Sequence, residues 1–242
     1  MSFKRYSSRT QAGAFLAKFV LDRNDDLKNL LKLNPDQFFT FAIPNGGVPV
    51  AEGFCSYLNI RYEILIVRKI KIPFNPEAGF GSITTDGTVL INNQLLSQLN
   101  LSNNELKHSI DLTKQEIKER LKYYNKLETP EIKYEKLIQD KTIFLIDDGL
   151  ASGFTMLAAI KMMKKYKPKK VIISIPTAPI HTIKRIQSEV DKIYCPNIKH
   201  TSWFAVADAY QHWYDVPESE VVEMMNKSDH YLGNLKSNKT IQ

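Results

Sequence analysis

The stretch that decides the fold is residues 142–156, which read Thr-Ile-Phe-Leu-Ile-Asp-Asp-Gly-Leu-Ala-Ser-Gly-Phe-Thr-Met. Its first five residues are apolar or β-branched, which is typical of a strand buried on both faces of a parallel sheet flanked by helices. Two carboxylates, Asp147 and Asp148, follow at the end of that strand, where such sheets bind their ligands. The stretch therefore predicts an α/β fold with a binding site directly after residue 146.

A loop of small residues and hydroxyls follows the two acids and opens a helix near Met156. Small side chains let backbone N–H groups converge, and a helix N-terminus adds a positive dipole, so the loop is expected to hold a phosphate. Two carboxylates beside a phosphate would repel it unless they face sugar hydroxyls or a divalent cation. A sugar phosphate satisfies both requirements. The alternative, a plain strand–turn–helix junction with Asp as the helix cap, accounts for one of the two acids.

The segment Asp-Asp-Gly-Leu-Ala-Ser-Gly-Phe-Thr, residues 147–155, resembles the 5-phosphoribosyl-1-pyrophosphate (PRPP) motif of the type I phosphoribosyltransferases, and the wider chain is similar to an uncharacterised bacterial and archaeal branch of that family. The resemblance implies a Rossmann-like parallel sheet flanked by helices, with a hood or lid subdomain. It also implies that Asp147 and Asp148 hold the ribose hydroxyls and Mg²⁺ as catalytic and metal-binding residues. The 5′-phosphate would then be held by Gly149, Ala151, Ser152, Gly153, Phe154 and Thr155.

One position of this loop separates the chain from part of the family. In the salvage enzymes for hypoxanthine and guanine, the third residue after the two acids is an Asp proposed as general base. Here that residue is Ala151, and a methyl group accepts no proton. The loop therefore disfavours that chemistry and leaves adenine-like, uracil-like, amine-type and other acceptors open.

A second glycine turn, residues 44–49, follows another predicted strand. Gly46 and Gly47 expose backbone N–H groups to an anion and permit a positive φ if the turn needs it. The turn looks like the pyrophosphate loop of the same family, with Asn45 standing where a basic residue usually precedes the glycines. A plain β–α connection is the alternative. Arg68 and Lys69 close the next predicted strand, where they are expected to neutralise pyrophosphate or, alternatively, to form a solvated strand end.

An aromatic segment, residues 203–213, lies near the C-terminus. It resembles the base-recognition stretch of purine salvage phosphoribosyltransferases, with Phe204 at the stacking position, Val206 beside it, and Gln211 where an acid often binds the purine. An aromatic ring facing a planar base would stack on it. The alternative is that the rings of this segment belong to the core.

The remaining pattern indicates one domain over residues 1–228 and a polar tail over residues 229–242. Residues 70–140 are expected to form a hood insertion containing a flap, Asn75 to Gly81. The expected strands are 37–43, 62–67, 142–146, 171–175 and 192–195. The expected helices are 9–33 (one helix or a broken pair), 50–58, 156–165 and 181–190. A hairpin near 82–91 and a long helix with the stripe Leu106, Ile110, Ile117 and Leu121 complete the pattern.

Composition limits the partners. The chain has 242 residues, 43% hydrophobic and 24% charged, with a net charge of +7 that suits an anionic ligand. Nucleic acid is not expected, because the basic run 161–170 contains only one aromatic residue. Cys55 and Cys195 fit no metal spacing, and there is no signal peptide or bilayer-length apolar run, so the protein is expected to be cytoplasmic and not bound to a membrane. A homodimer is compatible with the sequence.

The function predicted from these observations is a Mg²⁺-dependent pentosyltransferase of nucleotide metabolism. It would move 5-phosphoribosyl from PRPP to a nitrogenous small-molecule acceptor, a nucleobase or a related compound, and release pyrophosphate. Two alternatives stay open: a non-catalytic regulator that binds PRPP or a nucleotide, and a hydrolase of PRPP or another sugar phosphate on the same fold.

Overall fold

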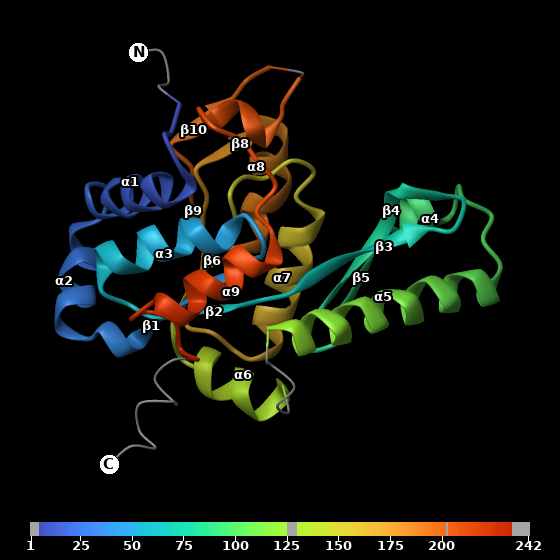
Figure 1. Cartoon of the computed structure of the whole chain (residues 1–242), viewed down its shortest axis with the longest axis horizontal. Coiled ribbons are helices and arrows are strands. Elements are labelled where there is room, and N and C mark those ends of the chain that lie inside the picture. The colour runs from blue at the N-terminus through green and yellow to red at the C-terminus, as the bar shows by residue number, and fades with distance from the viewer. Residues whose placement is uncertain (1–4, 125–129, 202, 234–242) are drawn as a thin grey trace.

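The computed structural model describes residues 5–124, 130–201 and 203–233, and its centre is a five-stranded parallel sheet (Figure 1). The strands lie in the order β2-β1-β6-β7-β9. Because the order reverses between β1 and β6, these two strands form the switch point of a doubly wound sheet. The predicted α/β fold is confirmed. The bounds are β1 Phe38–Ala42, β2 Tyr62–Ile64, β6 Thr142–Ile146, β7 Lys170–Ser174 and β9 Lys192–Tyr194.

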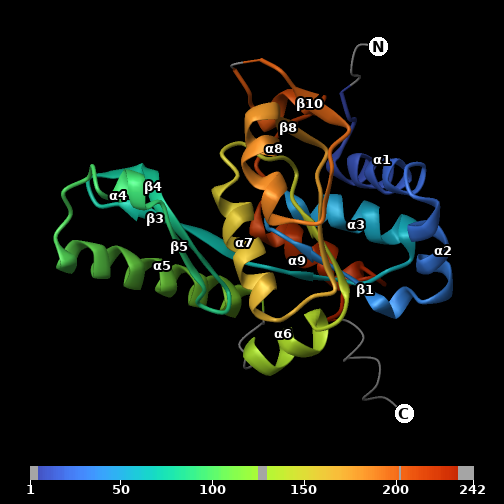
Figure 2. The same cartoon turned by 180° about the vertical axis from the view of Figure 1, so that it is seen from behind.

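Helices cover both faces of this sheet, which explains the uninterrupted apolar run of β6. All five residues of β6 are buried. Phe144 and Ile146 join the core on one face, whereas Ile143 and Leu145 join the core on the other. The first face carries α1 Arg9–Leu21, α2 Asp25–Leu33, α3 Gly47–Leu58 and α9 Glu218–Lys227, and the second carries α6 Pro130–Ile138, α7 Phe154–Lys165 and α8 Ile180–Ile186 (Figures 1 and 2).

An arm extends from one side of this body in both views (Figures 1 and 2). It contains an antiparallel sheet in the order β3-β4-β5, with α5 packed along it. The predicted apolar stripe of the long helix is confirmed, because Ile117 is buried and Leu106, Ile110 and Leu121 pack against the core. The bounds are β3 Val67–Ile72, β4 Asn75–Thr84, β5 Val89–Ile91, α4 Asn93–Leu96 and α5 Asn103–Tyr123.

A buried acid ties the arm to the body. Asp86, in the turn between β4 and β5, accepts hydrogen bonds from Thr84 Oγ1 at 2.7 Å and from Tyr166 Oη, just after α7, at 2.9 Å. Lys165 Nζ lies 3.2 Å from the same carboxylate, whose side chain has no exposed surface. Burial alone would raise the pKa of Asp86, but these hydrogen bonds hold it below its usual value.

The remaining small elements complete the body. β8 Thr177–Pro179 and β10 Asn197–Lys199 form a two-stranded parallel sheet. Single 3₁₀ turns lie at Pro35–Gln37, Gln187–Glu189 and Val206–Ala209. Among the described residues, no helix combines the length and apolarity that crossing a bilayer requires.

The strand predicted over 62–67 is two strands. β2 ends at Ile64, and Val67 already begins β3 in the arm, so Arg68 and Lys69 lie inside an antiparallel strand instead of at the end of a parallel one. Leu65 and Ile66 between them are buried, so hydrophobicity alone does not mark the bend. The segment expected as a flap, residues 75–81, is the first part of β4 and pairs with β3 across a register shift at Lys71.

Two further boundaries differ from expectation. α6, inside the expected hood range, packs on the body, because Tyr134 and Ile138 are buried in the core beside β6. The polar tail is expected from residue 229, but residues 230 and 232 pair with β2. Tyr62 N donates to His230 O at 3.0 Å, and Leu232 N donates to Tyr62 O at 3.0 Å. Residues 230–232 therefore extend the edge of the sheet at β2. Residues 234–242 lie outside the described part of the chain.

Candidate active site

Two loops meet at the switch point of the sheet. One connects β1 to α3 and contains Gly46 and Gly47, and the other connects β6 to α7 and contains Asp147 and Asp148. The strands pair in register, with Ala42 opposite Ile146, so both loops leave the same edge at the same level. This crevice is where an open parallel sheet binds its ligands.

The two loops touch, and this contact explains both glycines. A Cβ on Gly46 would lie 1.9 Å from Asp148 Oδ2, and a Cβ on Gly47 would lie 2.9 Å from the carbonyl oxygen of Ile146. Gly46 has φ −62°, a value open to any residue. The turn therefore needs glycine for the close approach of the loops and not for a positive φ.

The two acids are held differently. Asp148 N donates to Asp147 Oδ1 at 2.8 Å, while Asp148 Oδ2 accepts from Arg9 Nε at 2.9 Å. Burial and the neighbouring Asp148 raise the pKa of Asp147 well above its usual value. Burial also raises the pKa of Asp148, although Arg9 opposes that rise. The site thus concentrates two carboxylates that are costly to ionise without a cation.

The loop after the acids is anchored from outside through its carbonyl groups. Thr182 Oγ1 in α8 donates to Ala151 O at 2.6 Å, and Arg185 Nη1 donates to Ser152 O at 2.8 Å. Gly153 has φ +79°, the left-handed region that favours glycine. Within the described ranges, no acceptor pairs with the backbone N–H groups of residues 151–153. These donors, at the N-terminus of α7, are available to an anion.

Comparison with known proteins assigns this architecture to a family. The model of the phosphoribosyl transferase domain matches residues 11–212, which include both loops. The chain belongs to this family.

Individual relatives agree with the phosphoribosyl transferase assignment. Proteins from two strains of Mycobacterium tuberculosis, whose own naming as phosphoribosyl transferases is provisional, are 25% identical over 226 residues, which is 93% of this chain. The chain spans about half the length of these curated relatives, 47%. The crystal structure of the protein TT1426 from Thermus thermophilus has a TM-score of 0.69 at 22% identity and covers 91% of this chain and 97% of its own. It shows the same fold.

The residues predicted for base recognition differ in their distance from the loop after the two acids. Val206 lies over the loop, because a Cβ on Gly149 would meet Val206 Cγ1 at 2.6 Å. Phe204 is half-buried two residues earlier. Gln211 turns to the N-terminal segment, since its N–H donates to Tyr6 O at 2.8 Å and its Nε2 to Arg5 O at 3.3 Å. The structure thus brings Val206 to the loop and engages Gln211 elsewhere, while the roles of Phe204 and Val206 stay predictions.

The predicted pyrophosphate side is held by the arm. Asn45 Oδ1 accepts from Arg120 Nη1 and from Tyr124 Oη, each at 3.1 Å, and Asn45 Nδ2 donates to Val216 O at 2.7 Å. Both polar atoms of the Asn45 side chain are therefore engaged, with Arg120 of α5, with Tyr124 directly after it and with the segment before α9.

The two predicted cations on β3 also face arm residues. Arg68 lies 3.3 Å from Glu116 of α5, which also accepts from Lys71 Nζ at 2.8 Å. Lys69 Nζ donates to Glu77 O. The pyrophosphate role of Arg68 and Lys69 stays a prediction, and in this conformation both engage protein groups.

Arg9 is the site residue that sequence reasoning missed. It is the first residue of α1, after the cap Ser8, and it reaches an acid far away in the chain. A cation in the first turn of a helix opposes the helix dipole. That unfavourable position was the available signal that Arg9 has a partner elsewhere.

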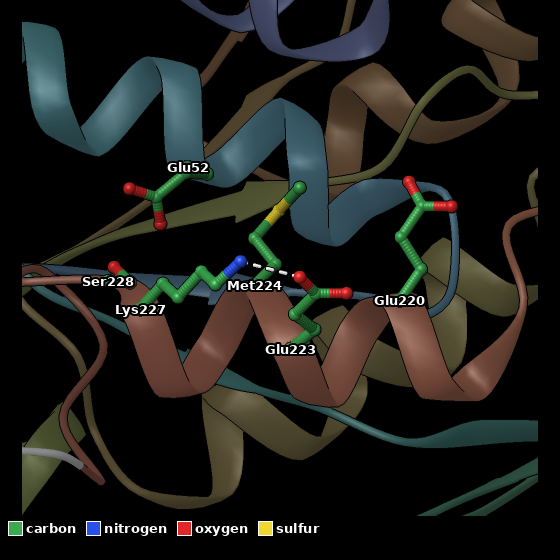
Figure 3. Close-up of a pocket in the computed structure, with 6 residues that line it drawn as sticks. All are labelled: Glu52, Glu220, Glu223, Met224, Lys227 and Ser228. Atoms are coloured by element: carbon green, nitrogen blue, oxygen red, sulfur yellow. Dashed lines mark hydrogen bonds and ion pairs between the residues drawn. The ribbon is translucent and has the colours of Figure 1, made fainter.

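A separate cavity of about 340 Å³ lies between α3 and α9 (Figure 3). Glu223 pairs with Lys227 there at 2.5 Å. The lining residues are Glu52, Glu220, Glu223, Met224, Lys227 and Ser228. None of them belongs to the two loops, so this cavity is not the candidate active site.

Proposed function

We propose that this protein is a phosphoribosyltransferase that moves the 5-phosphoribosyl group of PRPP to a nitrogenous acceptor and releases pyrophosphate. The observation that carries the proposal is the contact between the Gly46-Gly47 turn and the Asp147-Asp148 pair at one edge of the sheet. A plain ribose phosphate needs one loop, whereas PRPP has phosphate groups at both ends and needs two.

Each loop has a distinct task in this reaction. The backbone N–H groups of residues 151–153 bind the 5′-phosphate, and Asp147 and Asp148 accept hydrogen bonds from the ribose hydroxyls. The bond between the anomeric carbon and pyrophosphate breaks, and its electron pair leaves with pyrophosphate, as the bond to the acceptor nitrogen forms. The proton that the acceptor nitrogen loses passes to the departing pyrophosphate or to water. Positive charge grows on the anomeric carbon near the carboxylates, which stabilise it. The amide of Gly46 faces the leaving group, whereas the N–H of Gly47, also expected to bind the anion, donates to Ile43 O at 3.1 Å in this structure.

The residues present fit Mg²⁺. This cation binds through one or two carboxylates together with substrate oxygens and water, and Asp147 and Asp148 are two adjacent carboxylates. When bound, Mg²⁺ neutralises charge on the pyrophosphate.

The acceptor is proposed to be a nucleobase or a related compound of nucleotide metabolism, in a cytoplasmic setting. Support comes from Val206 over Gly149 and from the half-buried ring of Phe204 nearby in the chain. Stacking of a planar base on Phe204 is the expected contact. Arg68 and Lys69 are proposed to turn to the pyrophosphate when the arm closes on the substrate.

The test is release of pyrophosphate from PRPP and Mg²⁺ in the presence of a panel of nucleobases and amines. We expect release that depends on an acceptor. Release without an acceptor would indicate a hydrolase, and tight PRPP binding without release would indicate a regulator; either outcome overturns the transferase proposal.

Two variants tie the reaction to the site. Asp147→Asn, alone and together with Asp148→Asn, is expected to abolish PRPP binding or turnover while circular dichroism stays unchanged. The single variant is informative because it leaves the partner of Arg9 in place. Asp111→Asn is the matched control, since Asp111 is an exposed acid on α5. Normal PRPP behaviour of the double variant would refute the assignment of the acids.

A further inference from the structure

Arg9 is a buried cation at the candidate site with most of its hydrogen-bonding capacity unused. Its side chain is 5% exposed. An arginine side chain has five N–H donors, and the Nε–H of Arg9 is the one that Asp148 Oδ2 accepts. Within residues 5–124, 130–201 and 203–233, no acceptor pairs with its terminal Nη1 and Nη2 groups. Terminal nitrogens without a protein acceptor, on a cation at the edge of the candidate site, are available to an anionic ligand.

The fold positions Arg9 firmly. Tyr6 N donates to Ala209 O at 2.8 Å and Gln211 N donates to Tyr6 O at 2.8 Å, which fixes the N-terminal segment beside residues 209–211. Ser8 Oγ then accepts from Gln11 N at 3.1 Å and begins α1. Arg9 therefore enters the site from a capped helix instead of a loose terminus.

Arg9 lies beside the Gly46-Gly47 turn. A Cβ on Gly46 would be 3.2 Å from Arg9 Nε. Asn45 in the same turn carries no charge, and its side chain is bonded to Arg120, Tyr124 and Val216. Two cations therefore lie at this turn: Arg120, which is already paired with Asn45 and Glu218, and Arg9 from α1, whose terminal nitrogens are available.

We infer that Arg9 is the cationic ligand of the pyrophosphate group of PRPP, supplied from α1 to a pyrophosphate turn that has no charge of its own. The inference rests on the proposed function. A guanidinium binds phosphate oxygens through two parallel N–H groups, and Nη1 and Nη2 are the pair available for this. The Nε–H meanwhile keeps Asp148 oriented toward the ribose.

A tryptophan covers the ligand-binding group. The guanidinium carbon of Arg9 lies 4.1 Å from the ring centroid of Trp213, and Trp213 is 40% exposed. The rings of Tyr210 and Tyr214 lie 5.4 Å from the same guanidinium carbon, so Trp213 is the nearest of three rings and the one whose surroundings a ligand on Arg9 would change most. Trp213 is one of two tryptophans in the chain, and Trp203→Phe leaves it as a single fluorescent reporter.

The test measures binding of Mg²⁺-pyrophosphate, PRPP and ribose 5-phosphate by calorimetry, in the wild type, Arg9→Gln and Arg9→Lys. Loss of a charge-assisted pair predicts pyrophosphate affinity about ten- to hundredfold lower in Arg9→Gln, with a smaller loss for Arg9→Lys. In Arg9→Gln, the affinity for ribose 5-phosphate, which lacks pyrophosphate, should fall less than the affinities for Mg²⁺-pyrophosphate and PRPP.

In the Trp203→Phe background, binding of pyrophosphate should change the fluorescence emission of Trp213. Arg23→Gln, an exposed arginine stacked on Phe19, is the matched control and should bind all three ligands as the wild type does.

The inference is overturned if Arg9→Gln binds pyrophosphate as tightly as the wild type, or if it loses only ribose 5-phosphate, since Arg9 would then act through Asp148 alone. If Arg9→Gln does not fold, unchanged pyrophosphate affinity in Arg9→Lys is equally decisive. A failure of the proposed function looks different: PRPP binding would then also survive in Asp147→Asn.

Discussion

Gly46→Ala is the most direct probe of the contact between the two loops. The new Cβ would lie 1.9 Å from Oδ2 and 2.5 Å from Cγ of Asp148, so the carboxylate or the turn must move by more than about 1 Å, since overlap of this size is not tolerated in a packed interior. The carboxylate cannot swing away cheaply, because its side chain is 14% exposed and Arg9 holds it at 2.9 Å.

The expected loss of stability follows from whichever of two structural responses costs less free energy. Breaking a buried ion pair costs about 3–5 kcal/mol, whereas shifting an overpacked turn costs about 1–3 kcal/mol. The structure should take the second route, so we expect a loss of about 2 kcal/mol in the free energy of unfolding. For a chain of this length, that corresponds to a fall of about 4–8 °C in Tm. Displacing the acids by about 1 Å should also lower kcat/KM about 100-fold.

The assay pairs thermal unfolding with PRPP binding, and Gly87→Ala is the control. Gly87 has φ +83° and nothing within 4 Å of a built Cβ, so alanine there costs about 1–2 kcal/mol through backbone conformation alone and should leave PRPP binding unchanged. If Gly46→Ala melts within about 1 °C of the wild type, a margin well below the shift expected from overpacking, and binds PRPP normally, the loops do not touch as described and the reasoning is refuted.

Two further predictions concern the neighbouring residues. Burial and Asp148 raise the pKa of Asp147. The contribution of Asp147 to stability is therefore present below the ordinary carboxyl range and is lost as pH rises through the raised pKa. Asp147→Asn should accordingly be more stable than the wild type at neutral pH, and this difference should shrink in acid. A Tm difference that is independent of pH would contradict this. Thr182→Val leaves Ala151 O without its donor and should cost about 1–3 kcal/mol and weaken binding of ribose 5-phosphate, while Thr182→Ser should restore both; a silent Thr182→Val would show that the loop needs no anchor from α8.

The central strands could be predicted because a run of consecutive apolar residues indicates a strand that is buried on both faces. β6 has the bounds expected from its apolar run, Thr142–Ile146, and Asp147 and Asp148 follow at its end. The bend between β2 and β3 escaped prediction because Leu65 and Ile66 stay buried through it. A hydrophobic run reports burial and does not report which sheet a strand joins.

The contacts that complete the site could not be predicted, because they join residues distant in the chain. Arg9 meets Asp148 across 139 positions, and Asn45 meets Arg120 across 75. Local periodicity contains no information about such pairs. For the same reason the sequence indicated a missing charge at Asn45 but not the arginine that lies beside the turn.

The hydrogen bonds of Asn45 have a mechanical consequence. One amide side chain joins the β1–α3 turn to Arg120 and Tyr124 at the end of α5, the longest helix of the arm, and Arg120 continues to Glu218 of α9 at 3.0 Å. These bonds couple the position of the arm to the position of the turn. A ligand that repositions the turn must tilt the arm or break these bonds. Because the arm is long, a small movement of the turn would give a larger displacement of the arm tip, which could be measured as a sign of ligand binding.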